Sequence, residues 1–424
     1  MSSVSFMEKL LEGVEVEWRP LGTLGELVRG NGLQKKDFTE TGVPAIHYGQ
    51  IYTYYGLSTT ETKSFVSPDL AKQLRKVDKG DVVVTNTSEN LEDVGKALVY
   101  LGERQAVTGG HATVLKPGKN LLGKYFAYFT QTDAFLGEKR KHAKGTKVID
   151  VSATDMAKIS IPIPCPDNPK KSLEIQAEIV RILDSFTELT AELTAELTAE
   201  LTARKKQYNY YRDKLLRFEE GEVEWRTLGE VAKIQRGASP RPIAKYITDD
   251  EDGVPWIKIG DTSPGSKYVN RTAQKITLEG AEKSRVLNIG DFIMSNSMSF
   301  GRPYILGIRG AIHDGWASIS GFSETLNSDY LYHYLSSNAV QNYWAGKINS
   351  GSVSNLNADI IKTLPVPIPD LVTQDRIASI LDKFDALTQS ITEGLPREIE
   401  LRQKQYEYYR NLLLSFPKPE GAEA

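Results

Sequence analysis

The chain has 424 residues, and at about 150 residues per domain this length predicts two or three domains. Its 52 Lys and Arg residues nearly balance its 55 Asp and Glu residues, which gives a formal net charge of −3. That balance argues against a lone nucleic-acid-binding domain, which is usually strongly basic. The 40% of hydrophobic residues exclude a disordered or fibrous chain.

The cysteine content and the hydropathy pattern exclude further classes of protein. Cys165 is the only cysteine, so an intramolecular disulfide and a multi-cysteine zinc or iron–sulfur site are excluded. No stretch approaches the roughly 18 consecutive apolar residues that a membrane-spanning helix needs. The start, Met1–Glu8, lacks the basic and apolar regions of a signal peptide. We therefore expect a soluble, cytoplasmic protein.

Several motifs of the first half of the sequence are repeated in the second half. Glu15–Arg19 is repeated as Glu222–Arg226, a shift of 207 residues (222 − 15). The motifs at both ends of Ile182–Arg212 recur at the ends of Ile380–Arg410, a shift of 198 residues (380 − 182). Both of these copies end in Lys-Gln-Tyr-x-Tyr-Tyr-Arg. Such self-similarity predicts two related structural units.

The two ends of the chain resemble the junction between its halves. Lys9–Gly13 resembles Lys214–Gly221, and Phe416–Gly421 resembles Phe218–Gly221. The chain thus ends where its own repeat would begin again. This favours a closed arrangement with a pseudo-twofold axis and neighbouring termini, whereas a tandem duplication with free ends is the alternative.

Residues 1–170 form the first predicted unit, a mixed α/β domain. Val82–Thr85 is an apolar run bounded by turn signals and is predicted to be a strand, and the aromatic-rich segment Leu122–Phe135 is predicted to be a helix. A dense basic run follows, and Lys and Arg side chains suit DNA phosphates. The candidate DNA-binding residues of this unit are Lys35, Lys36, Gln50, Tyr52, Lys139, Arg140, Lys141, His142, Lys144 and Lys147.

These candidates have other interpretations. The run Lys139–Lys147 is also typical of a solvated charged loop, although small or basic residues at the equivalent place in the second half weaken that view. Gln50 is selected because a glutamine amide can pair bidentately with adenine. The tyrosines around it could equally be sheet residues.

Residues 171–218 contain neither Gly nor Pro, and apolar residues recur at helical spacing throughout. This pattern predicts one long central helix, about 65–70 Å at 1.5 Å per residue. The tetrad Thr-Ala-Glu-Leu occurs three times in Thr190–Leu201. Each tetrad adds about 6 Å and rotates the chain about 40° beyond a whole turn. The repeat is typical of a spacer whose length changes in units, and low-complexity helix is the alternative.

Residues 219–370 form the second predicted α/β unit. The run Gly290–Met294 predicts a strand, and the aromatic-rich segment Asp329–Trp344 predicts a helix. His313 and Asp314 could be half of an acid–base pair, but a locally hydrogen-bonded turn is the favoured interpretation. Arginine can read guanine and asparagine can read adenine. The candidate DNA-binding residues of this unit are Arg236, Arg241, Asn296, Arg302, Lys347, Ser350 and Ser352.

Residues 371–424 predict a second long helix, from about Leu371 to Phe416, that is broken or kinked by Gly394 and Pro396. We expect it to pack antiparallel against the central helix as a coiled-coil rod, because each stripe of apolar residues needs a cover. The fold class is therefore mixed α/β, with two pseudo-twofold-related domains separated by two antiparallel helices. The predicted rod or subunit-interface residues are Leu189, Leu193, Leu197, Leu201, Tyr208, Tyr211, Tyr406 and Tyr409.

Catalytic motifs are missing from the sequence. It has no phosphate-binding GxxxxGK[ST] loop, no GxSxG elbow, no HExxH and no adenine-methyltransferase Asn-Pro-Pro-Tyr motif. The five His residues are scattered without zinc-ligand spacing. We therefore expect no catalytic residue, no metal ligand and no cofactor in this chain.

The combination of motifs resembles one family across essentially the whole chain. Two divergent α/β units, each followed by a long helix ending in Lys-Gln-Tyr-x-Tyr-Tyr-Arg, resemble the specificity subunit of type I restriction–modification enzymes. The Thr-Ala-Glu-Leu tetrads resemble the type IC branch. The sequence departs from a symmetric pattern in the second helix, where Gly394–Pro396 replaces the tetrads.

The resemblance implies a non-catalytic DNA-reading protein. Each unit would be a target-recognition domain for one half of a bipartite, asymmetric site in double-stranded DNA, and the helices would set the unread gap. The helices would also dock two modification subunits, which carry S-adenosylmethionine, and restriction subunits that use ATP and Mg²⁺ would join the complex. A structural adaptor that joins proteins through the rod without reading DNA is the alternative.

Overall fold

The computed structural model describes residues 14–219, 221–263, 265–295, 301–349, 356–389 and 394–416. The chain divides into two compact units. Unit 1 comprises Met1–Glu192 and Gln403–Ala424, and unit 2 comprises Leu193–Arg402. The C-terminal segment therefore folds with the N-terminal part of the chain, and the long central helix runs through both units.

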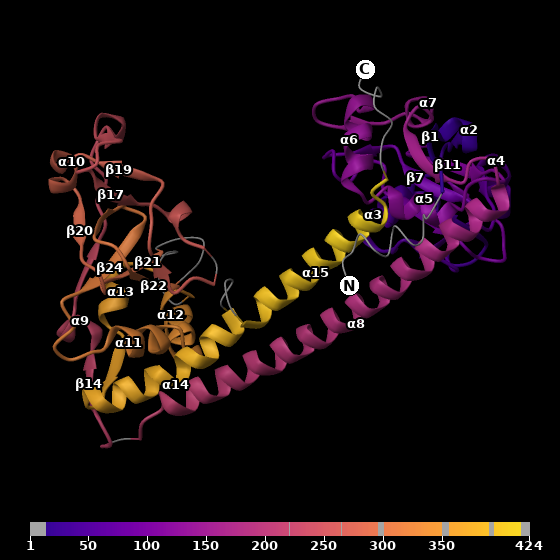
Figure 1. The fold of residues 1–424 in the computed structure, drawn as a ribbon. Helices are drawn as coiled ribbons and strands as arrows, with labels where there is room; N and C mark the ends of the chain where they lie inside the picture. The colour runs from indigo at the N-terminus through magenta and orange to yellow at the C-terminus, as the bar shows by residue number, and fades with distance from the viewer. Residues whose placement is uncertain are drawn as a thin grey trace. The chain divides into compact units, whose positions relative to one another are not determined.

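Unit 1 is built on a five-stranded sheet, in the order β2-β11-β7-β9-β4, and a four-stranded sheet, in the order β5-β3-β10-β6 (Figure 1). β11 is antiparallel to both β2 and β7, and β1 pairs antiparallel with β13. The predicted strand Val82–Thr85 is confirmed as β7. The strands are β1 (Val16–Pro20), β2 (Gly25–Arg29), β3 (Val43–Ile46), β4 (Ser58–Thr59), β5 (Ser64–Val66), β6 (Arg75–Val77), β7 (Val82–Thr85), β8 (Thr87–Ser88), β9 (Ala97–Tyr100), β10 (Ala106–Thr108), β11 (Ala112–Pro117), β12 (Ile149–Asp150) and β13 (Ser160–Pro164).

The helix predicted at Leu122–Phe135 is two helices. The chain turns between α5 and α6, where Thr132 Oγ1 accepts a hydrogen bond from the N–H of Phe135 and so begins a new helix. The long helix α8 agrees closely with the prediction. The helices of this part of the chain are α2 (Leu21–Leu24), η1 (Lys35–Asp37), α3 (Tyr48–Thr53), α4 (Pro68–Gln73), α5 (Gly123–Phe129), α6 (Asp133–His142), α7 (Ala153–Met156) and α8 (Pro169–Leu215).

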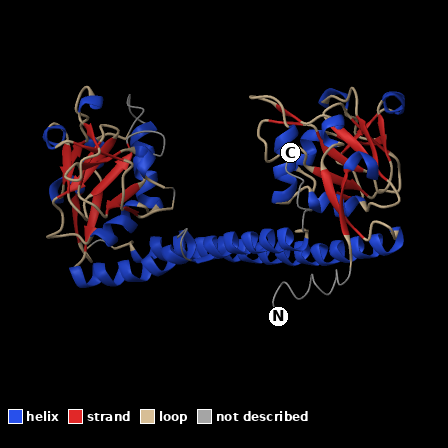
Figure 2. Ribbon diagram, turned by 45° about the horizontal axis from the view of Figure 1, so that its top comes forward, coloured by secondary structure: helices blue, strands red, loops and turns tan. Residues whose placement is uncertain are grey.

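Unit 2 repeats this plan with two five-stranded sheets, in the orders β15-β24-β21-β22-β18 and β16-β19-β17-β23-β20. The predicted strand at Gly290–Met294 is confirmed as β21. Figure 2 shows the strands of each unit lying to one side of the long helices. The strands are β14 (Glu224–Thr227), β15 (Lys233–Arg236), β16 (Ile247–Thr248), β17 (Val254–Ile257), β18 (Tyr268–Val269), β19 (Gln274–Ile276), β20 (Arg285–Leu287), β21 (Phe292–Ser295), β22 (Pro303–Leu306), β23 (Gly310–Ile312), β24 (Trp316–Ser320) and β25 (Pro365–Ile368).

The helix predicted at Asp329–Trp344 is also two helices, α11 and α12, because the chain turns at Ser336 and Ser337. The C-terminal helix is interrupted as predicted, between α14 and α15. Gly394 begins α15 with a φ of 77°, and a Cβ there would lie 2.6 Å from Ala386 O, so glycine is required. The helices are α9 (Leu228–Val231), η2 (Ile243–Lys245), η3 (Ile259–Asp261), α10 (Leu278–Glu282), α11 (Ser328–Leu335), α12 (Asn338–Asn349), α13 (Ala358–Lys362), α14 (Leu371–Gln389) and α15 (Gly394–Leu413).

The long helices are part of the hydrophobic cores. In unit 1, Ile179 and Leu183 of α8 share a core with Leu413, Leu414 and Phe416 at the end of the described chain. The N-terminal residues Val14, Val16 and Trp18 pack against the same core. Both described ends of the chain therefore belong to the core of unit 1.

A buried glutamine fastens α8 and α14 each to the loop that leads into an aromatic-rich helix of its unit. Gln176 Oε1 accepts the N–H of Leu122 at 2.8 Å, and its Nε2 donates to Asn120 O at 2.9 Å. Gln374 Oε1 accepts the N–H of Asn327 at 2.8 Å, and its Nε2 donates to the carbonyls of Thr325 and Pro369 at 2.9 and 2.8 Å. Both glutamines are fully buried, so these bonds fix the attachment of the helices.

Among the described residues, no helix combines the length and the apolar character needed to cross a membrane.

Candidate nucleic-acid interface

Each unit contains a turn in which two backbone segments approach too closely for any side chain. The N–H of Gly30 donates to Ala112 O at 2.8 Å, and the N–H of Gly237 donates to Trp316 O at 2.8 Å. At either glycine a Cβ atom would lie 2.1 Å from a carbonyl oxygen, so glycine is required. We call this feature the glycine turn, and it marks equivalent positions in the two units.

An exposed arginine precedes each glycine turn. Arg29 Nε donates to Gly110 O at 3.1 Å, and Arg236 Nε donates to Asp314 O at 2.9 Å. Arg236 was among the predicted DNA contacts. Arg29 was not, although the Arg-Gly pair repeats at the shift of 207 residues (236 − 29) and could have indicated it.

Lys139 faces the interior of unit 1. Its side chain is only 3% exposed, and its Nζ donates to Glu92 O at 3.0 Å and to Val94 O at 2.5 Å. The prediction that Lys139 contacts DNA is wrong, because its ammonium group holds the loop between β8 and β9 against α6.

The stability of unit 1 should therefore depend on pH through Lys139. Burial lowers the pKa of Lys139 to about 8, whereas an unfolded lysine titrates near pH 10.4, so between these values the unfolded chain binds more protons and the free energy of unfolding rises with pH. We expect wild-type protein to gain about 1–3 kcal/mol relative to Lys139→Met between about pH 8 and pH 10. Chemical denaturation of both proteins across this range measures the difference, and a constant difference would contradict the burial.

The remaining cations of the basic run lie on the surface. Arg140, Lys141, Lys144 and Lys147 are exposed, and His142 is half-buried. Lys141 pairs with Glu138 at 3.4 Å, and Lys144 pairs with Asp155 at 2.7 Å. The run covers the last turn of α6, where cations also complement the helix dipole. The run is thus partly helical, and four of its five Lys and Arg side chains are accessible.

Two of the other candidates in unit 1 are engaged by the protein. The segment around Gln50 and Tyr52 is the helix α3, so its tyrosines are not sheet residues. Gln50 Nε2 donates to Ser64 Oγ at 2.6 Å, and Tyr52 Oη donates to Thr87 O at 2.8 Å. Pairing with adenine would require Gln50 to give up its bond to Ser64. By contrast, Lys35 and Lys36 are exposed on η1.

In unit 2 two candidates lie together at the glycine turn. Arg241 Nη2 lies 3.6 Å from Asp314 Oδ2, and Arg236 Nε donates to the backbone carbonyl of Asp314. Arg302 lies over the ring of Tyr304, and Lys347 lies over the ring of Tyr343. The predicted residues Asn296, Ser350 and Ser352 lie outside the described residues.

His313 and Asp314 form a local turn, as the favoured interpretation predicted. His313 Nδ1 accepts the N–H of Gly315 at 2.9 Å, and its Nε2 lies 3.1 Å from Asp314 Oδ1. The hydrogen bond from Ser239 is the main cause that lowers the pKa of Asp314. The carboxylate is therefore charged and fixed in place.

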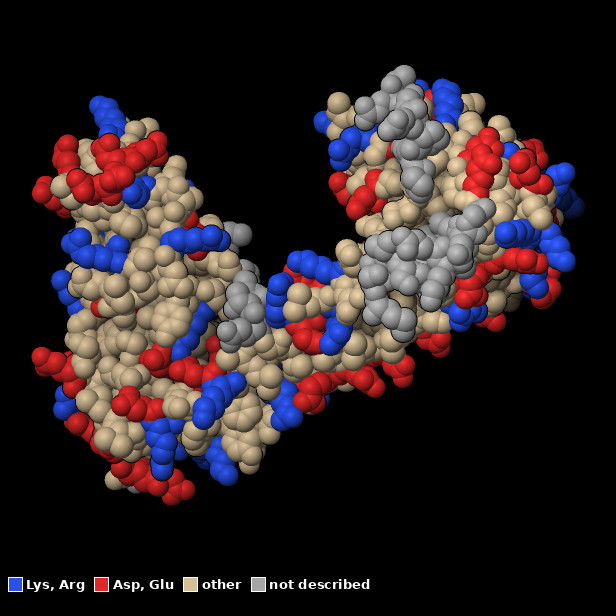
Figure 3. All heavy atoms as spheres, in the orientation of Figure 1, with Lys and Arg blue, Asp and Glu red and all other residues tan. Residues whose placement is uncertain are grey.

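Charges of both signs are mixed on the surface. Figure 3 shows Lys and Arg interspersed with Asp and Glu on the visible face of each unit, and acidic side chains gathered at one end of unit 2. The exposed loop Asp249–Asp252, between β16 and β17, carries four carboxylates. This face offers no broad basic field, so DNA contact would depend on a few placed cations.

The tyrosines at the ends of α8 and α15 contact phenylalanines at equivalent positions in the two units. In unit 2, Tyr211 stacks on Phe384 with ring centroids 5.6 Å apart; in unit 1, Tyr409 lies 6.0 Å from Phe186. Tyr406 Oη contacts Thr187 Oγ1 at 2.9 Å. Because Thr187 meets Tyr406 while Phe186 meets Tyr409, the two helices run antiparallel in unit 1. These tyrosines pack the helices, as predicted.

Tyr208 is buried in unit 2, where its Oη lies 3.0 Å from His333 Nδ1. Leu193, Leu197 and Leu201 are half-buried. Leu189 is 61% exposed, so it does not pack within the rod, and its predicted place at a subunit interface stays a prediction. Three residues after Phe186 correspond to about 300°, which places Leu189 about 60° off the covered stripe.

Comparison with known proteins identifies the family. The family model of the type I restriction modification DNA specificity domain matches residues 13–203 and 220–401. The chain belongs to this family. The specificity subunit of the EcoR124I and EcoR124II type I restriction enzymes from Escherichia coli is 38% identical, over 99% of each chain. The EcoprrI specificity subunit, also from Escherichia coli, is 32% identical over 93% of each chain.

Solved structures share the fold of this type I specificity subunit. One chain from a study of complex assembly and conformational transition of the type I R-M system has a TM-score of 0.67. It is 16% identical and covers 94% of this chain and 97% of its own. The HsdS subunit from Thermoanaerobacter tengcongensis has a TM-score of 0.52 at 16% identity, with 94% and 95% coverage. The resemblance to specificity subunits and the mixed α/β fold class are confirmed, and the adaptor alternative is not favoured.

Proposed function

We propose that this specificity subunit recognises a bipartite, asymmetric DNA target, with unit 1 reading one half-site and unit 2 the other. The glycine turn carries this proposal. Both units keep the same backbone contacts and the same exposed arginine, Arg29 or Arg236, but Gly110 in unit 1 corresponds to Asp314 in unit 2. The two units thus share one backbone arrangement but present different side chains, which suits the recognition of two different half-sites.

The exposed cations supply contacts that do not depend on sequence. Lys and Arg side chains bind phosphate oxygens and fix the register of a protein on the duplex. In unit 1 the exposed cations include Arg29 and the predicted contacts Lys35, Lys36, Arg140, Lys141, Lys144 and Lys147. Because the whole chain is nearly neutral, we expect weak DNA binding by this subunit alone and stronger binding by its complex.

A second tyrosine in each unit suits a protein partner. Tyr210 is 61% exposed and Tyr408 is 60% exposed. Tyr210 meets the ring of Tyr211 edge-on with ring centroids 5.3 Å apart, and Tyr408 meets Tyr409 in the same way at 5.4 Å. Exposed aromatic residues on a helix are typical anchors of protein interfaces. Two equivalent anchors favour two copies of one partner, and we assign them to modification subunits that carry S-adenosylmethionine. Restriction subunits using ATP and Mg²⁺ would join the same complex.

Methylome sequencing tests the DNA-reading function. The subunit is co-expressed with its modification subunit in a host without other adenine methylation. We expect one methylated motif made of two different half-sites and an unread gap. A complex that assembles but methylates without sequence preference would instead support the adaptor alternative.

Replacing either exposed tyrosine should remove one modification subunit. We expect Tyr210→Ala or Tyr408→Ala to weaken one docking site about 30-fold, which is the size of a typical interface anchor. Native mass spectrometry should then show complexes with one modification subunit instead of two. Tyr54→Ala is the matched control, because Tyr54 is 58% exposed but lies in a loop of unit 1. Full occupancy in both variants would exclude these anchors.

A further inference from the structure

The glycine turns of the two units present different chemistry to a ligand. In unit 1 the residue that corresponds to Asp314 is Gly110, which has no side chain to pair with an arginine. In unit 2 the turn residue is Asp314, and it faces Arg241 across 3.6 Å. The Arg–Asp pair is therefore specific to unit 2.

Asp314 is held from several directions. Its Oδ1 accepts a hydrogen bond from Ser239 Oγ at 2.9 Å, and its backbone N–H donates to Ser239 Oγ at 3.3 Å. His313 accepts the Gly315 N–H at Nδ1, so its proton sits on Nε2, which faces Asp314 Oδ1 at 3.1 Å. The other carboxylate oxygen, Asp314 Oδ2, faces the guanidinium group of Arg241 and orients it.

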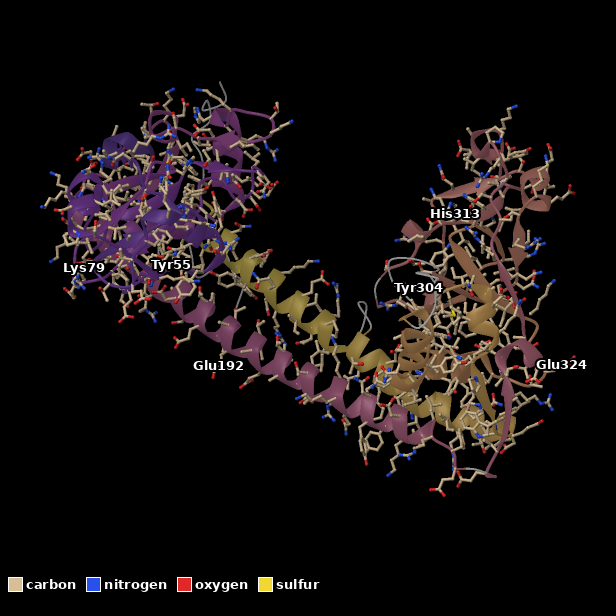
Figure 4. The ribbon with its side chains drawn as sticks, turned by 180° about the vertical axis from the view of Figure 1, so that it is seen from behind. Tyr55, Lys79, Glu192, Tyr304, His313 and Glu324 are labelled. Carbon is tan, nitrogen blue, oxygen red and sulfur yellow. The ribbon has the colours of Figure 1, made fainter. Side chains whose placement is uncertain are left out.

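Arg241 borders a hollow of about 630 Å³ in unit 2. Its side chain is 84% exposed, while Trp256, in the lining of the hollow, is buried. Lys258 and Gln274 also line it and are joined by a hydrogen bond of 2.8 Å. The strands β17 and β19 carry this wall, at the end of unit 2 away from α14 (Figure 1). Figure 4 shows His313 on the side of Tyr304 away from the long helices.

We propose that Arg241, oriented by Asp314, reads a guanine in the half-site of unit 2, and that this inference rests on the proposed DNA-reading function. The fork of a guanidinium group matches O6 and N7 of guanine in the major groove. A carboxylate behind the arginine reduces the rotamer freedom that is lost on binding. The carboxylate also offsets part of the positive charge of Arg241, which weakens its attraction to a phosphate. This favours contact with a base edge over contact with the DNA backbone.

The test is methylome sequencing of the complete complex with substitutions at this pair. Arg241→Ala should make one G·C position in one half-site degenerate, with discrimination falling about ten- to a hundredfold, and should leave the other half-site unchanged. Arg241→Lys should relax the same position, because lysine keeps the charge but loses the fork. Asp314→Ala should relax this position partly, as expected of a positioning residue.

Arg226→Ala is the matched control. Arg226 also pairs with a carboxylate, Glu224 at 2.7 Å, but it lies on β14, and its loss should leave the motif unchanged. If Arg241→Ala lowers methylation at every site without changing the motif, Arg241 contacts phosphate and the proposal is overturned. If the wild-type complex methylates no bipartite motif, the proposed function itself fails.

Discussion

Deleting Thr194–Leu197 is expected to shorten the unread gap between the half-sites while both half-site sequences stay the same. These residues lie inside α8, a continuous helix of 47 residues that runs through both units. Removing four residues shortens a helix by about 6 Å and rotates one end by about 40° relative to the other. The wild-type target should therefore lose methylation altogether, because its half-sites no longer fit both units at once.

The repetition of the tetrad makes this deletion structurally mild. Leu193, Leu197 and Leu201 are half-buried at a spacing of four residues, so the shortened helix keeps a leucine at each covered position. The length-matched control is Thr194→Ala with Thr198→Ala, which removes the bond from Thr198 Oγ1 to Thr194 O but no residue. Methylome sequencing decides the matter, since an unaltered gap after the deletion would reject a spacer role.

Replacing the buried Gln374 by methionine is expected to destabilise unit 2 by about 3 kcal/mol or more. Methionine fills a similar volume, but it leaves the N–H of Asn327 and the carbonyls of Thr325 and Pro369 without their partner. Each buried backbone group without a hydrogen bond costs about 1–3 kcal/mol. Urea denaturation, followed by signals from each unit, measures the loss of unfolding free energy.

Gln176→Met makes the same change in unit 1, where Gln176 serves Leu122 and Asn120. The two losses should add, because the sites share no partner. Gln403→Met is the control, since this helical glutamine is exposed and its Nε2 donates to Glu407 Oε1 at 3.3 Å on the same helix. An effect of Gln374→Met no larger than that of the control would contradict a fastening role.

Local patterns predicted the elements that depend on local chemistry. Periodicity located α8, the turn signals before Val82 and Phe292 located β7 and β21, and Gly394 located the break between α14 and α15. The turns that split the two aromatic-rich helices were missed. There short polar segments, Thr130–Asp133 and Ser336–Asn338, interrupt the apolar runs, and Thr132 caps the helix that follows the first of them.

The candidate site depended on contacts between distant segments, which explains its errors. Lys139 looked like its exposed neighbours, because the carbonyls of Glu92 and Val94 that receive its ammonium group lie more than 40 residues away. The link between Arg241 and Asp314 spans 73 residues (314 − 241) in the same way. Sequence alone predicted which residue types were available, and packing decided which of them face solvent.

The sharing of one core by both described ends of the chain has a consequence for biosynthesis. Leu413, Leu414 and Phe416 complete the core against which Val14, Val16 and Trp18 pack, so unit 1 cannot finish folding until residues 413–416 have left the ribosome. A prematurely terminated chain would carry an open apolar face and become a substrate for chaperones and proteases. Such quality control would remove chains with only one completely folded unit, which would direct modification to the wrong sequences.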